Sequence, residues 1–289
     1  MGKYIIICFW VVLLLGCSKE EWVDTIQPDI NFFAVPVDAT GEEADLRRMF
    51  FKDNGIYLLF SDTLGVREAS TLAGSIVQDY QIIDFNYTML PPPSSYVDSL
   101  ELFQYKDIKQ KKIAAQWLSE EIIPAVAEVF HPYSILLVDH FIRFKNAGTE
   151  YEEAVIQRVY TSFQTTVIAL GDVTTATKEE LQEIKTYLIQ QMVIDKFHTI
   201  PEEEFETFYS FSKDYYDQYF GWLPEPVQSV GFIVCDYWSE KEVDKLDFVK
   251  EMYKLPETIF RETYKEFPLI ISKMEEMKRI FHKYGINVY

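Results

Sequence analysis

Histidine is rare in this 289-residue chain, and its rarity excludes one class of metal site. The four histidines are His131, His140, His198 and His282, and no two of them are four residues apart. A His-Glu-x-x-His motif places two imidazoles on one helical face, where both bind the same zinc ion. No register of the sequence supplies that motif. A Gly-x-Ser-x-Gly motif and a glycine-rich phosphate-binding loop, which mark serine hydrolases and nucleotide sites, are also absent.

Basic residues are also few, because 27 Lys and Arg stand against 46 Asp and Glu and the net charge is −19 at pH 7. Such a surplus of negative charge repels the phosphates of nucleic acids and of anionic lipids. We therefore expect no nucleic-acid partner. Hydrophobic residues make up 48% of the chain, which is enough to bury a core and to exclude a disordered protein.

The first apolar run, residues 4–15, is shorter than the roughly 20 residues that a membrane-spanning helix needs. It leads into Leu14-Leu15-Gly16-Cys17, which matches a bacterial lipobox. We therefore predict a lipoprotein signal peptide at residues 1–16 and a lipid on Cys17; a plain signal peptide with a chance cysteine is the alternative. The mature chain would then keep Cys235 alone, so its fold must be stabilised by a core and not by an internal disulfide.

The rest of the chain divides into a tether and one domain. Residues 17–48 are acidic and lack sustained periodicity, so we expect the lipidated N-terminus and a tether there, followed by a single domain over residues 49–289. Segments rich in β-branched and aromatic residues predict strands at residues 56–60, 80–87, 133–144 and 155–170. The last two of these strands are expected in the same sheet as the first.

Helical periodicity dominates the remaining segments. Thr177 and Glu180 form a capping box, which predicts the start of a long helix that contains the stretch 186–198. Further helices are predicted at residues 107–130, with a bend at Pro124, and at residues 242–254 and 257–282. Strands followed by a helical half indicate an α+β fold.

The order of these segments resembles a family of Bacteroidetes lipoproteins, the zinc metallohydrolases associated with substrate import. The resemblance covers most of the mature chain. It is carried by the lipobox and, in chain order, by residues 54–60, 122–124, 166–170, 230–233, 245–253 and 278–286. It implies a zincin-like metallopeptidase fold, in which a twisted sheet lies beside an active-site helix that bears His-Glu-x-x-His, and a later helix adds an acidic ligand.

The positions that the resemblance assigns to zinc chemistry hold other residues here. Alignment to the family places Gln190 and Ile194 at the two ligand positions and Gln191 at the general-base position. A neutral amide is a poor zinc ligand and takes up no proton at neutral pH, and an aliphatic side chain has no lone pair. The later helix offers only Asp247 where the family has an acidic pair. We therefore expect a pseudoenzyme with no zinc and no catalytic residues.

The resemblance also implies a location and partners. Residues 18–21, Ser-Lys-Glu-Glu, resemble the acidic export signal of Bacteroidetes lipoproteins, so we expect a protein anchored to the outer membrane through Cys17 and facing the cell exterior. There it would accompany a TonB-dependent transporter and hold a glycan or peptide in the former active-site cleft. Two alternatives remain, a hydrolase that uses a non-standard set of groups and a purely structural subunit of an outer-membrane complex.

Three other polar sites are better explained without a ligand. His198 lies close to Glu202, Glu203 and Glu204, but a histidine that ends one helix and glutamates that open the next give the same pattern. Asp139 and His140 are adjacent in a predicted strand, where neighbours face opposite sides of the sheet. Cys235 is expected to be a small buried residue.

Aromatic residues crowd residues 205–222. Their three- and four-residue spacing predicts a packed helical face, so core packing is the preferred interpretation for most of them. An exposed platform that stacks on sugars or peptides is the alternative, for which the candidates are Tyr215, Tyr216 and Trp222.

Overall fold

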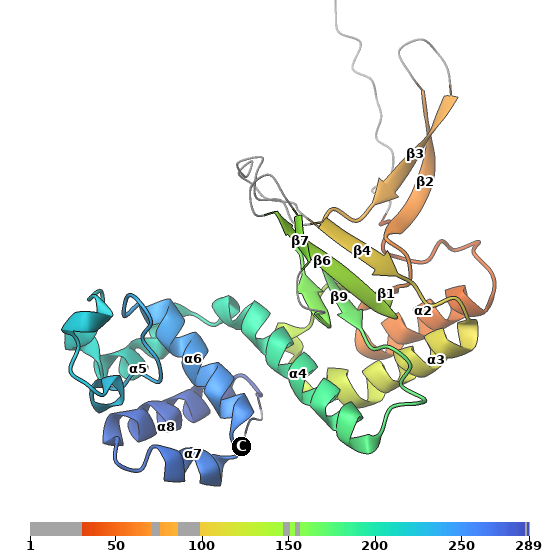
Figure 1. Ribbon diagram of the computed structural model, residues 1–289. Coiled ribbons are helices and arrows are strands. Elements are labelled where there is room, and N and C mark those ends of the chain that lie inside the picture. Colours follow the sequence, from red (N-terminus) through yellow and green to blue (C-terminus); the bar gives the residue numbers. More distant parts are fainter. Residues whose placement is uncertain are drawn as a thin grey trace, which may run out of the picture. The chain divides into compact units, whose positions relative to one another are not determined.

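The first half of the fold contains a four-stranded mixed sheet (Figure 1). Its order is β1 (Tyr57–Leu59), β5 (Ser134–Val138), β9 (Thr165–Ala169) and β8 (Val159–Thr161). The first three strands run parallel, and β8 pairs antiparallel with β9 at the edge. Every residue of β5 and β9 is buried, as is usual where both faces of a parallel sheet are covered.

The computed structural model describes residues 31–70, 76–85, 99–146, 151–153, 157–286 and 288. The predicted signal peptide, Cys17 and most of the predicted tether lie outside these residues. Within them, no helix combines the length and apolarity that a membrane span requires. Residues from Phe33 onward belong to one compact unit, so this unit starts before the expected boundary at residue 49. The helix α2 (Glu42–Asn54) crosses that boundary.

Two smaller sheets complete the strands. One is a hairpin of β2 (Thr63–Ser70) and β3 (Ile76–Ile82), and the other contains β4 (Ser99–Phe103), β6 (His140–Asn146) and β7 (Tyr151–Glu153). The prediction of one strand at residues 133–144 is therefore wrong, because that segment divides at Asp139 between two sheets. Asp139 donates its backbone N–H to the carbonyl of Phe103, a partner that local sequence does not reveal. Residues 155–170 likewise contain a hairpin, β8 and β9, and not one strand.

The helix predicted at residues 107–130 is shorter than expected. It consists of α3 (Ile108–Trp117), a π-helical turn (Leu118–Ile122) and a 3-10 turn (Ile123–Ala125). Pro124 lies in the last turn, where its ring and missing N–H end the helix instead of only bending it. A separate 3-10 turn follows at Glu128–Phe130.

The helix α4 (Lys178–Lys196) starts at the predicted capping box. Glu180 donates its backbone N–H to Thr177 Oγ1 at 3.2 Å, and the backbone N–H of Thr177 donates to the Glu180 carboxylate at 2.7 Å. These two bonds satisfy amides that the first helical turn leaves without partners. The buried face of α4 consists of Ile184, Leu188, Met192 and Val193.

The C-terminal half is helical and contains α5 (Glu206–Ser210), α6 (Lys241–Lys254), α7 (Glu257–Thr263) and α8 (Pro268–Lys283). One continuous helix at residues 257–282 was expected, but α7 ends at Thr263 and Pro268 begins a new helix at its first position, where proline is well tolerated. The helices are joined or extended by 3-10 turns at Phe197–Thr199, Glu202–Phe205, Lys213–Tyr215, Phe220–Trp222 and Val227–Val230.

The core lies on both faces of the four-stranded sheet. In β5, Ile135 and Leu137 join the large cluster under the helices, whereas Leu136 and Val138 join a smaller cluster with Phe141 of β6. This alternation follows from the two-residue period of a strand. The described chain is therefore a mixed α+β fold, as predicted, with its helical half packed around one continuous core.

Candidate functional site

A groove of about 660 Å³ lies between α4 and α6. Its α4 wall includes Gln190, Gln191 and Ile194, the three positions that the family resemblance assigns to zinc chemistry. All three side chains are half-buried. Because residues 190 and 194 are one helical turn apart, they share one face of α4, as expected from their spacing. We call this feature the α4–α6 groove.

The opposite wall of the α4–α6 groove consists of Lys250, Tyr253 and Lys254 of α6. Lys250 also bonds Asp247 at 3.3 Å and Lys254 bonds Glu251 at 3.2 Å, so each ammonium has a nearby counterion. The lining of the groove thus contains amides, two tyrosines, one threonine hydroxyl, two ammonium groups and a single carboxylate, that of Glu183. These groups form hydrogen bonds, but they are not a zinc donor set.

Asp247 does not lie in the wall of the groove, although the resemblance assigned it to the zinc site. Its side chain is largely buried, and burial raises the pKa of its carboxyl, while the neighbouring Lys250 acts in the opposite direction. Among the residues that the structure describes, no group of three His, Cys, Asp or Glu side chains could hold a metal ion. The residues that line the α4–α6 groove therefore do not fit zinc.

A second hollow, of about 910 Å³, adjoins the first along α4. Glu183 and Tyr187 border both hollows, and the second also contacts Arg158 and Asp172. The depression therefore follows α4 over several turns. Its length suits an extended ligand better than a single small molecule.

The side chain of Tyr253 has an unmet hydrogen-bonding need. Its hydroxyl is buried and has no partner within the described parts of the chain, and burial raises the pKa of the phenol. Sequence reasoning missed this residue, because helical periodicity assigned it only a place in α6. A buried polar group without a partner costs stability or marks a place that a ligand or water satisfies.

Replacing Tyr253 with phenylalanine is expected to leave the free energy of unfolding unchanged or to raise it by up to about 1 kcal/mol, because only an unsatisfied hydroxyl is lost. Urea denaturation measures this difference. Tyr264 provides the matched control, since its hydroxyl donates to Glu251 at 3.0 Å. The Tyr264→Phe change should lower the free energy by about 1 kcal/mol. A clear loss of stability in Tyr253→Phe would contradict the expectation and indicate that the hydroxyl has a partner.

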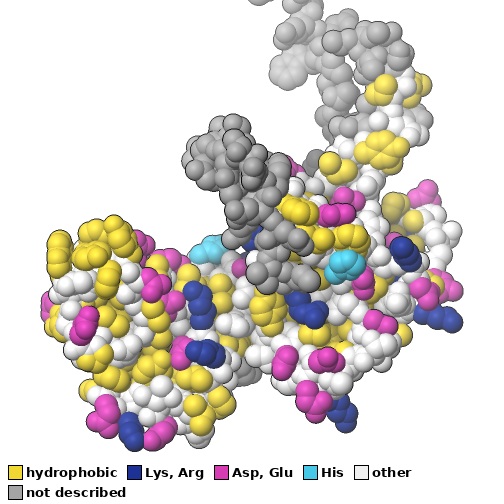
Figure 2. Space-filling view, in the orientation of Figure 1, with side chains coloured by type: hydrophobic (Ala, Val, Ile, Leu, Met, Phe, Trp, Pro, Cys, Tyr) yellow, Lys and Arg dark blue, Asp and Glu magenta, His cyan; other side chains and the backbone are white. Residues whose placement is uncertain are grey.

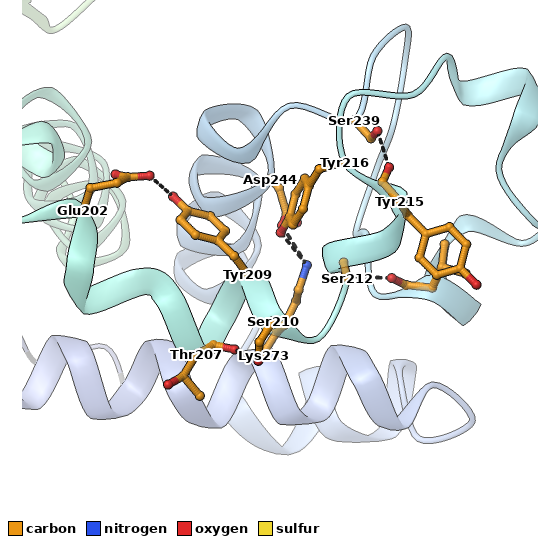
Figure 3. Close-up of polar contacts among 11 residues, drawn as sticks. Glu202, Thr207, Tyr209, Ser210, Ser212, Tyr215, Tyr216, Ser239, Asp244 and Lys273 are labelled. Atoms are coloured by element: carbon orange, nitrogen blue, oxygen red, sulfur yellow. Dashed lines mark hydrogen bonds and ion pairs between the residues drawn. The ribbon is translucent and has the colours of Figure 1, made fainter.

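A buried ion pair lies among the helices of the C-terminal half. Lys273 of α8 places its Nζ 2.7 Å from Asp244 Oδ2 of α6, and the two side chains are 0% and 1% exposed. Figure 3 shows Tyr216 directed at the same carboxylate, to which its hydroxyl donates at 2.5 Å. Burial raises the pKa of Asp244 and lowers that of Lys273, because each charged form loses its hydration.

Aromatic rings enclose this ion pair. The Lys273 ammonium lies 4.7 to 5.6 Å from the ring centroids of Phe208, Tyr216, Phe232 and Phe248. Cation–π attraction therefore replaces part of the lost hydration. Tyr216, a candidate for ligand binding, is thus a core residue at 8% exposure. The pair joins α6 to α8 and is not open to a ligand.

The other aromatic candidates differ in exposure. Tyr215 is half-buried against the core, whereas Trp222 is 74% exposed. Core packing, the preferred interpretation of this segment, holds for the buried residues Phe205, Phe208, Tyr209 and Tyr216. Trp222 is an exception, and its ring packs edge-to-face on the half-buried Tyr219, which in turn contacts the exposed Tyr237, a residue that sequence reasoning did not single out.

The remaining polar candidates are explained by their neighbours. Glu202 accepts hydrogen bonds from Lys245 at 2.8 Å and from Tyr209 at 2.7 Å, and it begins the turn after His198 as expected. Asp139 Oδ2 lies 2.7 Å from His140 Nδ1, so the expectation that they face opposite sides is wrong. The reason is that β5 ends before Asp139 and β6 begins after it.

Cys235 is half-buried, and burial raises the pKa of its thiol. The thiol therefore stays protonated at neutral pH, which disfavours a nucleophilic role.

Comparison with protein-family models, curated proteins and solved structures finds no match. The α4–α6 groove and the surface around it are therefore the features that bear on function.

Proposed function

We propose that this protein is a surface lipoprotein with a catalytically degenerate, zincin-like domain, and that it serves as a binding component of an outer-membrane nutrient-uptake system. The observation that carries the proposal is the wall of the α4–α6 groove. Gln190, Gln191 and Ile194, the positions that the family resemblance assigns to zinc chemistry, line one open groove and supply neither an imidazole nor a carboxylate, which supports the proposal.

The arrangement of elements supports the zincin-like part of the proposal. A mixed sheet precedes a long helix, α4, and a later helix, α6, lies against it across the groove. This is the order of parts that the family resemblance implies. The fold by itself does not carry the function, which depends on the side chains of the groove.

The groove supports binding in place of catalysis. Its amides and ammonium groups donate hydrogen bonds to carbonyl, hydroxyl or carboxylate oxygens. Two adjoining hollows extend along α4, as a peptide or glycan chain would require. No side chain in the α4 wall at residues 190, 191 and 194 can act as a general base or bind a metal-activated water.

The lipobox supports the location. A lipid on Cys17 would anchor the chain to the outer membrane, and the acidic residues that follow would direct it to the cell exterior. A TonB-dependent transporter is the proposed partner, with a glycan or peptide as ligand.

Metal analysis and hydrolysis assays on the purified, detergent-solubilised lipoprotein test the proposal. We expect no stoichiometric zinc after expression in zinc-supplemented medium, and no hydrolysis of peptide or glycan substrates with or without a chelator. One bound zinc per chain, with hydrolysis that a chelator abolishes, would overturn it. Hydrolysis that survives chelation would instead identify an enzyme with a non-standard site. Co-purification with a transporter without any ligand binding would favour a structural subunit.

A further inference from the structure

Four large aromatic side chains are exposed at one place in the C-terminal half. Phe220, Trp222, Tyr237 and Trp238 are 36%, 74%, 65% and 42% exposed, and Tyr219 lies between them. We call these five residues the aromatic surface. Figure 2 shows hydrophobic side chains gathered at the surface in this part of the molecule. Contiguous exposed aromatic residues are uncommon on soluble domains and mark a place of interaction.

The aromatic surface consists of two segments, residues 219–222 and residues 237–238, and backbone hydrogen bonds in and beside these segments hold them together. Phe220 donates its N–H to the carbonyl of Tyr237 at 3.0 Å, and Asp217 donates to Ser239 at 3.1 Å. Ser239 is buried, and its hydroxyl donates to the carbonyl of Tyr215 at 2.5 Å. The segments are therefore tied to each other and to the core. A surface ordered before binding loses little conformational entropy when a ligand arrives.

The rings of the aromatic surface also support one another. Tyr219 contacts the other four rings at centroid distances of 4.7 to 6.2 Å, all tilted or edge-to-face. Gly221 makes this possible, because a Cβ at that position would lie 2.8 Å from the Tyr219 ring. The exposed rings are thus braced by a central one and do not collapse onto the core.

The segment that carries the aromatic surface is acidic, and the exposed basic residues Lys213 and Lys241 lie directly outside it. Residues 214–240 contain no Lys, Arg or His, and their charged residues are Asp214, Asp217, Glu225, Asp236 and Glu240. All five are exposed. Carboxylates repel phosphate, sulfate and uronate groups, so the surface disfavours anionic membranes and acidic polymers. They accept hydrogen bonds from hydroxyl groups.

We propose that the aromatic surface binds a neutral polysaccharide. The apolar C–H faces of pyranose rings would pack on Trp222 and Tyr237, and their hydroxyls would donate to Asp217 and Asp236. An uncharged, hydroxyl-rich chain can stack on the aromatic rings and donate hydrogen bonds to the carboxylates, and it carries no negative charge that these carboxylates would repel. The inference rests on the proposed binding function and names its ligand class, but it places the contact on loops outside the α4–α6 groove.

Affinity electrophoresis of the detergent-solubilised full chain in gels that contain one polysaccharide each tests this proposal. The neutral probes are β-glucan, mannan, arabinogalactan and starch, and the anionic probes are alginate and pectin. We expect at least one neutral probe to retard the protein and neither anionic probe to do so. Trp222→Ala and Tyr237→Ala should each weaken the retained interaction about tenfold or more, which corresponds to about 1.4 kcal/mol.

Phe163→Ala is the matched control, because Phe163 is 72% exposed but lies far along the chain, in the turn between β8 and β9. It should bind as the unaltered protein does. Circular dichroism should show that Trp222→Ala stays folded, since most of that side chain is exposed. The proposal is overturned if no neutral probe retards the protein, or if both substitutions leave retardation unchanged. Loss of binding to phospholipid vesicles or to a cationic peptide in these variants, without any polysaccharide binding, would equally overturn it. None of these results alters the zinc measurement, so the two proposals fail separately.

Discussion

Replacing Lys273 with methionine is expected to lower the free energy of unfolding by about 3–5 kcal/mol, the largest effect of any substitution considered. The ammonium is fully buried and is the closest counterion of Asp244, at 2.7 Å. Removing it leaves a carboxylate in the core whose remaining hydrogen bond comes from Tyr216, and within the described part of the chain Asp244 Oδ1 already lacks a partner. Chemical denaturation monitored by tryptophan fluorescence measures the loss.

Two further variants make that result interpretable. Adding Asp244→Asn to Lys273→Met removes the unpaired buried charge. The free energy of unfolding of the double variant should therefore be more than about 1 kcal/mol higher than that of the single variant. Lys265→Met removes an ammonium of the same kind from an exposed pair with Glu262 and should change stability by less than about 0.5 kcal/mol. A single Lys273 variant as stable as the Lys265 control would show that the pair is not buried as described.

The double substitution of Gln190 and Ile194 to histidine is expected to create a metal site where none is expected in the natural chain. The two positions are one turn apart on α4 and both line the α4–α6 groove, so two imidazoles there can reach one ion. Metal that binds only the folded state stabilises it. At a zinc concentration of 100 times the dissociation constant, the free energy of unfolding should rise by about 2.7 kcal/mol.

Matched variants test the same point. Gln190→His alone, and the unaltered chain, should show no such zinc-dependent rise, because one imidazole binds zinc weakly. Hydrolysis should stay absent in the double variant, since Gln191 is no base and Asp247 lies outside the groove wall. Failure of the double variant to bind zinc would show that the two positions do not converge, and would remove the basis for reading the groove as a former zinc site.

Local features of the structure follow from local sequence. The capping box at Thr177 begins α4, and the apolar run at residues 56–60 contains β1. Each depends on residues within one or two turns of each other, where capping and propensity act. Residues 133–144 were assigned to one strand because composition does not identify pairing partners. The division at Asp139 depends on Phe103 of β4 and on β9, both distant in sequence.

The candidate site could be predicted only in part, because short-range spacing identifies the face of a helix but not the element that packs against it. Helical spacing placed Gln190 and Ile194 on one face, and the groove contains both. Spacing within α6 did not reveal which of its faces meets α4, and that face carries Tyr253 and not Asp247. Tyr216 was a candidate for an exposed platform, but it is buried in the core, where it contacts Lys273 from a helix more than fifty residues later.

The amino-acid sequence by itself determined the predicted lipobox, the acidic charge, the absence of a His-Glu-x-x-His motif and the starts of α3, α4, α6 and α7, because each depends on residue type or short-range spacing. Only the tertiary structure decided which side chains share a groove, which aromatic residues are buried and which two loops meet to form the aromatic surface. Those outcomes depend on packing between elements far apart in the chain, where burial of apolar area and pairing of buried charges select one arrangement among many.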